Sequence, residues 1–107
     1  MQTKTRFQDE TKINNTKWLQ AWFKDQCNGD REHSHGISIN TLDNPGWKIE
    51  ISLSDTDFEN LKLDFIKIDI SEEDWYTFGV KDETFIGVGN TSKLEFLIGK
   101  FRELVTK

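Results

Sequence analysis

The chain has 107 residues, a net charge of −5 and a single cysteine. This length predicts one domain. Eight Phe, four Trp and one Tyr supply large rings that can build a small core and that argue against disorder. The acidic balance disfavours binding to nucleic acid or to an anionic membrane, because both need an excess of Lys and Arg. One cysteine excludes an intramolecular disulfide. Since no secretory signal or transmembrane stretch is visible either, we expect a cytoplasmic protein.

The acidic residues are concentrated in the middle of the sequence. Residues 49–83 contain 11 acidic and 3 basic residues, which gives a net charge of −8, whereas the flanking segments are close to neutral. Such a block is typical of a solvated surface or of a surface that meets a basic partner.

The first predicted element is a helix that follows a polar arm. Residues 1–13 have no apolar period, so we expect a flexible arm there and a single domain over residues 14–107. Asn15 or Thr16 can cap the helix, and Gly29 can end it with a positive φ. The apolar residues of this segment recur on one helical face: Trp18, Leu19, Trp22, Phe23 and Cys27.

Two alternating runs, at residues 37–40 and 47–53, predict a pair of strands. The sequence Asp-Asn-Pro-Gly at 43–46 lies between them. Pro followed by Gly favours a type II turn in which Gly46 takes the positive φ, so a hairpin is expected. Trp47 is in phase with the inward-facing isoleucines and is predicted to join the core. An exposed indole in a binding loop is the alternative.

Three more strands are predicted from residues 61–70, 76–80 and 85–88. In the first of these the alternation slips by one residue at Phe65-Ile66. Either a β-bulge lies there, or only the second half of the run is a strand.

A second amphipathic helix, capped by Thr91 or Ser92, closes the domain. Its apolar face consists of Leu94, Leu97, Ile98, Phe101, Leu104 and Val105. The order of elements is therefore α-β-β-β-β-β-α. Short connections between five strands predict an antiparallel meander. The expected fold is a two-layer α+β domain, in which two helices pack on a mainly antiparallel five-stranded sheet.

The densest group of polar side chains includes Cys27, Asp30, Glu32, His33 and His35. These residue types could serve a small metal-dependent or thiol enzyme. The spacing is poor, however, because there is no CxxC pair or HExxH helix, and two histidines two residues apart on a strand would face opposite sides. Cys27 lies on an apolar helical face, which favours an inert buried thiol. We therefore expect no enzymatic activity, no metal and no cofactor.

Trp75 and the acidic run before it are the second notable feature. Trp75 is out of phase with the apolar residues that follow it, so its ring is predicted on the opposite face of the sheet. There it could cover that face or anchor a partner. The run Glu72-Glu73-Asp74 has the usual composition of a solvated turn, and nothing in the pattern provides an apolar pocket that would raise a carboxyl pKa.

Several motifs along the chain carry a family resemblance. They read W-L-x-x-W from Trp18, Q-C-x-G-D-x-E-H from Gln26, G-I from Gly36, T-L-D-N-P-G-W from Thr41, D-W from Asp74 and F-x-G-x-G-N from Phe85. Together they resemble the immunity protein 53 family of bacterial polymorphic toxin systems, over roughly residues 16–105. The chain departs from that family at Arg31, where Trp is expected, and in a longer segment before Asn15.

The resemblance implies a protein that binds and neutralises a cognate toxin and performs no chemistry. Many such toxins are nucleases, and an acidic surface would mimic phosphate and occlude a basic substrate groove. We therefore expect a basic toxin as the partner, with contacts from carboxylates and an anchoring indole. A homodimer through the uncovered sheet face is a further option. The predicted partner-binding residues are Glu32, His33, Asp43, Glu72, Glu73, Asp74 and Trp75.

Overall fold

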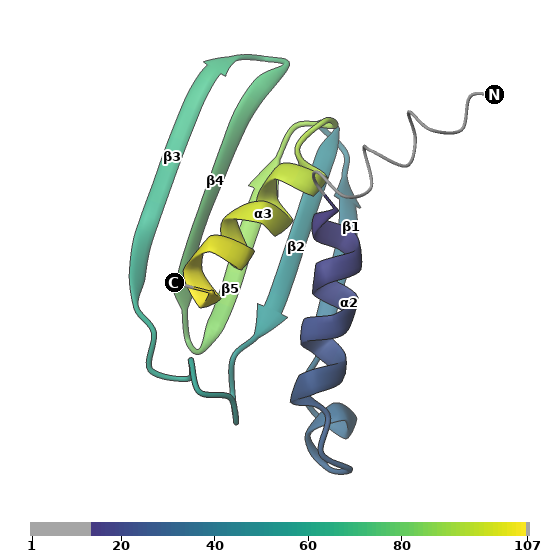
Figure 1. Cartoon of the computed structure of the whole chain (residues 1–107). Helices are drawn as coiled ribbons and strands as arrows, with labels where there is room; N and C mark the ends of the chain where they lie inside the picture. Colours follow the sequence, from purple (N-terminus) through teal and green to yellow (C-terminus); the bar gives the residue numbers. More distant parts are fainter. Residues whose placement is uncertain (1–13, 107) are drawn as a thin grey trace, which may run out of the picture.

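A computed structural model describes residues 14–106, so the predicted arm lies outside the described residues (Figure 1). The elements are α2 (Asn15–Gln26), η1 (Arg31–His33), β1 (Ile37–Leu42), β2 (Gly46–Ser52), β3 (Leu63–Ser71), β4 (Asp74–Lys81), β5 (Thr84–Gly89) and α3 (Leu94–Val105). This order confirms the predicted α-β-β-β-β-β-α sequence. Between residues 14 and 106, the short 3-10 helix η1 is the one element that was not predicted.

The five strands form one antiparallel sheet in the order β1-β2-β5-β4-β3. The predicted meander is therefore wrong at one connection, because β2 pairs with β5 and not with β3. Ile49 of β2 lies opposite Gly87 of β5, and Ile51 lies opposite Phe85. The two most buried strands thus occupy the middle of the sheet, and the largely exposed strands β1 and β3 form its edges. Burial of apolar surface favours this order over simple sequential pairing.

Both helices lie on the same face of the sheet (Figure 1), which confirms the two-layer α+β architecture. The ring of Phe101 on α3 lies between the helix α2 and the sheet. Its centroid is 4.9 Å from that of the Trp22 ring, in an edge-to-face arrangement, and 5.2 Å from that of the Phe85 ring. The core that they share consists of Leu19, Trp22, Ile49, Ile51, Leu53, Phe78, Phe85, Leu97, Ile98 and Phe101. We call the other face of the sheet, which the described helices leave uncovered, the open face.

The N-terminus of α2 differs from the prediction by one residue. Asn14 is the N-cap, and its side chain accepts the backbone N–H of Lys17 at 2.9 Å. The predicted caps Asn15 and Thr16 instead donate to the carboxylate of Glu95 on α3, at 2.7 and 2.8 Å. The first turn of one helix is therefore satisfied by a side chain of the other.

The start of α3 was also predicted differently. Its N-cap is Lys93 and makes no side-chain capping bond, so neither Thr91 nor Ser92 caps the helix. The loop is fixed in another way. The indole N–H of Trp47 donates to the carbonyl of Thr91 at 2.9 Å. Trp47 lies on the same sheet face as Ile49 and Ile51, as predicted, but it is only half-buried and is not part of the core.

The β1–β2 hairpin is present, but Gly46 has a different role from the predicted one. Gly46 lacks the positive φ of a type II turn and is the first residue of β2. A Cβ at this position would collide with the carbonyl of Gly89 and touch the ring of Trp75. Glycine is required here because two strands and an indole approach closely.

The phase slip predicted at Phe65-Ile66 coincides with a shift in strand register. The pairing of β3 with β4 shifts in register between Leu63 and Ile66, and again between Asp69 and Ser71. The strand begins at Leu63 and not at Leu61, but it contains both halves of the alternating run, so the alternative of a strand in the second half only is wrong. The shift places Phe65 on the open face, where its ring lies against Gly79.

Candidate functional site

The seven predicted partner-binding residues divide between the two ends of the sheet. The β1–β2 turn, the β3–β4 turn and the β5–α3 loop share one end, which is at the top of Figure 1. Asp43 lies in the first of these turns and Glu72 and Glu73 in the second, while Asp74 and Trp75 begin β4. Glu32 and His33 lie in η1, before β1 and at the opposite end. The structure thus brings five of the residues toward one end and separates two.

A hollow of about 1200 Å³ lies at the end that carries the three connections. Its walls come from the β1–β2 turn, from β3 and its turn into β4, and from the β5–α3 loop. Glu72, Glu73 and Trp75 line it, whereas Asp43 and Asp74 lie beside lining residues. The hollow is the site where acidic and aromatic predicted residues meet, and we refer to it as the acidic hollow.

Asn90 holds the floor of the acidic hollow in place. It is only 5% exposed. Its Oδ1 accepts the backbone N–H of Trp75 at 2.8 Å, and its own backbone N–H donates to the Trp75 carbonyl at 3.1 Å. Its Nδ2 donates to Ser92 Oγ at 2.9 Å. The sequence reasoning did not single out Asn90, although the residue ends the F-x-G-x-G-N motif.

Trp75 lies on the open face, as its phase predicted. Its ring reaches across the end of β5 toward Gly46, where an added Cβ would be 3.4 Å from Trp75 Cζ2. The side chain is half-buried and lines the acidic hollow. It therefore covers part of the sheet and still presents apolar surface to a partner.

The acidic residues of this end have different surroundings. Asp74 Oδ1 is 2.9 Å from Lys93 Nζ, which ties the start of β4 to the start of α3. Glu72 and Glu73 are exposed, and within residues 14–106 neither forms an ion pair. Glu72 and Glu73 can therefore meet a cation of another molecule without first giving up a partner, whereas Asp74 cannot.

Glu32, at the opposite end, stabilises a local turn. Its carboxylate accepts the backbone N–H groups of Asn28 and Gly29 at 2.9 and 2.8 Å. The hydrogen bond of its own backbone N–H is the main cause that lowers the pKa of Glu32 below its usual value. Desolvation opposes this effect, and the hydrogen bonds from Asn28 and Gly29 and the nearby His33 lower the pKa further. Gly29 has the predicted positive φ, 91°, but it does not end α2, which stops at Gln26 with Cys27 as its C-cap. His33 beside it is exposed.

The sequence model of a family described as immunity protein 53 matches residues 16–106. The chain belongs to the immunity protein 53 family. This match confirms the resemblance drawn from the motifs and places the chain among immunity proteins of toxin systems. No curated protein and no solved structure shows a significant match. In the described part of this immunity protein, none of the helices is long and apolar enough to cross a membrane.

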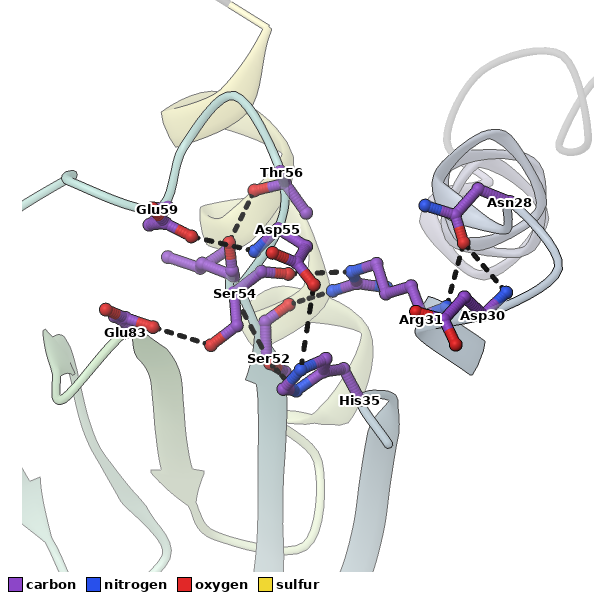
Figure 2. A network of polar contacts seen from close by, with 11 residues as sticks. Asn28, Asp30, Arg31, His35, Ser52, Ser54, Asp55, Thr56, Glu59 and Glu83 are labelled. Carbon is purple, nitrogen blue, oxygen red and sulfur yellow. Dashed lines mark hydrogen bonds and ion pairs between the residues drawn. The ribbon is translucent and has the colours of Figure 1, made fainter. Parts of the chain in front are cut away.

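Arg31 occupies the position at which we expected Trp in the immunity protein 53 family. It is only 2% exposed. Its guanidinium donates to the carbonyls of Ser54 and Ser52 at 2.8 and 2.7 Å, so it closes the end of β2 (Figure 2). The Arg31 side chain thus fills the buried position at which we expected a Trp ring, and its guanidinium is satisfied by two backbone carbonyls. The role of Arg31 is structural, and the local sequence gave no sign of it.

The metal or thiol alternative has little geometric support in this immunity protein. Within residues 14–106, no group of three or more His, Cys, Asp and Glu is arranged to hold a metal ion. His35 lies in a loop, not on the strand assumed earlier, with Nδ1 3.4 Å from Ser52 Oγ and Nε2 4.0 Å from Asp55 Oδ2 (Figure 2). Cys27 is half-buried, less than predicted, and its thiol donates to the Phe23 carbonyl at 3.4 Å.

Proposed function

We propose that this protein binds a cognate toxin domain, occludes it, and performs no chemistry of its own. The observation that carries the proposal is the acidic hollow, where the exposed carboxylates Glu72 and Glu73 stand beside the half-buried indole of Trp75. Exposed carboxylates steer a basic protein toward this end of the sheet and orient it. A half-buried indole adds apolar contact once water is excluded.

The chemistry of this surface fits a toxin with a basic face, such as a nuclease with a substrate groove. The lining of the hollow carries Asp69, Glu72 and Glu73 against one base, Lys67. Such a group of carboxylates resembles the charge of a phosphate backbone, which the groove of a nuclease is built to hold. Occlusion of the groove is sufficient for inhibition. We place this neutralisation in the bacterial cytoplasm, where a lone thiol such as Cys27 stays reduced.

The two ends of the sheet contribute unequally to the proposed interface. Asp43, Glu72, Glu73 and Trp75 supply the contacts, and Asp74 supports them through its ion pair with Lys93. Glu32 and His33 contact the same toxin only if it reaches the opposite end of the sheet. We therefore assign them a secondary role.

Co-expression with the toxin encoded by the adjacent reading frame tests the proposal. The wild-type chain should rescue growth and co-purify with the toxin. The double variant Glu72→Lys/Glu73→Lys should lose both properties, because two repulsive charges replace two attractive ones at the acidic hollow. Asp25→Lys/Glu103→Lys changes the net charge equally at two exposed positions on the helices and should retain both. Absence of rescue by the wild-type chain would refute the proposed function.

A further inference from the structure

Exposed apolar side chains gather on one edge of the sheet. Within residues 14–106, three of the four large hydrophobic residues that are exposed belong to β3, and the fourth is Ile39 on the other edge strand. The three are Phe65 (45% exposed), Ile66 (42%) and Ile70 (70%). Edge strands are normally protected by charge or by a covering segment, because their unpaired backbone groups recruit other strands. Within residues 14–106 no segment covers the outer side of β3. The strand carries the charged residues Asp64, Lys67 and Asp69 beside its exposed apolar side chains.

The apolar side chains of β3 lie on both sides of the sheet. Phe65 is on the open face against Gly79. Ile66 pairs with Phe78 and shares its helix-covered side. An added strand at this edge would therefore gain apolar contacts above and below its backbone, as well as the main-chain hydrogen bonds.

The edge is continuous with the acidic hollow, because Lys67, Ile68 and Asp69 of β3 line the hollow together with Glu72 and Glu73. A segment that pairs with β3 would thus run directly to the carboxylates of the β3–β4 turn. The apolar edge and the acidic hollow form one surface.

The charges next to β3 disfavour a second copy of this chain as the occupant. The turn after the strand carries Glu72 and Glu73, and the connection before it carries Asp55, Asp57 and Glu59 with one base, Lys62. Antiparallel self-pairing would place the acidic turn of one copy beside the acidic connection of the other. Parallel self-pairing would place each acidic segment beside its own copy. Like charges at the two ends of the strand oppose both arrangements, whereas a basic segment of another protein is attracted at both ends. Lys67 is the one basic residue within β3.

We propose that β3 is the docking strand of the toxin interface, and that an extended basic segment of the toxin pairs with it over residues 65–70. The inference rests on the proposed function and adds the mode of recognition. The partner segment lies along the β3 edge, contacts Phe65, Ile66 and Ile70, and places a basic side chain against Glu72 or Glu73.

Hydrogen exchange on the complex tests the docking strand. The probe is the purified, catalytically inactivated toxin domain from the adjacent reading frame. Backbone amides of β3 should exchange more slowly in the complex, while those of the opposite edge strand β1 should be unchanged. A complex without slower exchange in β3 would overturn this inference and leave the proposed function intact. Absence of any complex would remove the proposed function, and this inference with it.

Two matched variants give a second, independent test. Ile70→Arg and Ile39→Arg both place one positive charge at an exposed isoleucine on an edge strand. Ile70→Arg should weaken toxin binding at least tenfold, as expected at an apolar contact, and Ile39→Arg should change it less than about twofold. Equal effects of the two variants would overturn the inference. So would sedimentation of the free chain as a dimer that Ile70→Arg dissociates, since a second copy would then occupy the edge.

Discussion

At the scale of single residues, Asn90 holds the acidic hollow together. Its side chain accepts the backbone N–H of Trp75 in β4 and donates to Ser92 in the loop before α3. Asn90 thus links the start of β4 to that loop. An N–H group that is removed from water on folding and then has no acceptor destabilises the folded state. This penalty is larger than the net stabilisation that an average hydrogen bond provides.

Asn90→Ala should therefore destabilise the fold by about 1–3 kcal/mol, measured as the free energy of unfolding in urea. Asn40→Ala is the matched control, because the Asn40 side chain is exposed and donates only to Ser38 Oγ. The control should change stability by less than about 0.5 kcal/mol. Equal losses in the two variants would contradict the role given to Asn90.

Glu32 predicts a pH dependence with a definite sign. Its folded-state pKa is lowered from 4.5, so at moderately acidic pH the folded state binds fewer protons at this site than the unfolded state. The contribution of Glu32 to stability is present above the unfolded pKa and is lost as the pH falls through the folded pKa. Glu32→Gln should accordingly flatten the decline of stability below about pH 4.5. A carboxyl titration followed by NMR that shows no lowered pKa at Glu32 would refute this.

At the scale of elements, periodicity located the two α-helices and the five strands within residues 14–106, but neither η1 nor the residues that cap the helices and the strands that pair. The cap of α2 comes partly from Glu95, which is 80 residues away from Asn15 in sequence. No local pattern could indicate it. The pairing of β2 with β5 was missed because short connections suggested neighbours, whereas burial of Ile49 and Ile51 decided the strand order.

The junction of β2, β5 and Trp75 offers a test at this scale. Gly46→Ala would push a methyl group into the Gly89 carbonyl and should destabilise the protein by about 1–3 kcal/mol. Gly36→Ala adds the same methyl group at a position with no atom within 4 Å and without a positive φ. It should leave thermal unfolding nearly unchanged. A tolerated Gly46→Ala would show that the strands can separate at little cost.

At the scale of the whole molecule, the sequence located the acidic block but not its arrangement. Glu72, Glu73 and Trp75 were predicted from composition, phase and family resemblance, and the fold brings them to one hollow. Glu32 and His33 came from the same motif reasoning, yet η1 places them at the opposite end. The direction and order of the strands decide at which end of the sheet a motif lies. The spacing of motifs in the sequence does not reveal either of them. The apolar edge of β3 was missed, because an alternating strand looks the same whether a neighbour covers it or not.

The distribution of charge predicts how toxin association depends on salt. If Glu72 and Glu73 steer a basic toxin, the association rate constant should fall as ionic strength rises, because the Debye length shortens to about 8 Å at 0.15 M. Glu72→Gln/Glu73→Gln should lower that rate constant several-fold at low salt and reduce its salt dependence, with a smaller effect on dissociation. Trp75→Ala should mainly raise the dissociation rate constant, because an apolar contact forms after encounter. Stopped-flow mixing with the inactivated toxin measures both constants. An unchanged salt slope in the double variant would mean that the carboxylates of the acidic hollow do not guide encounter.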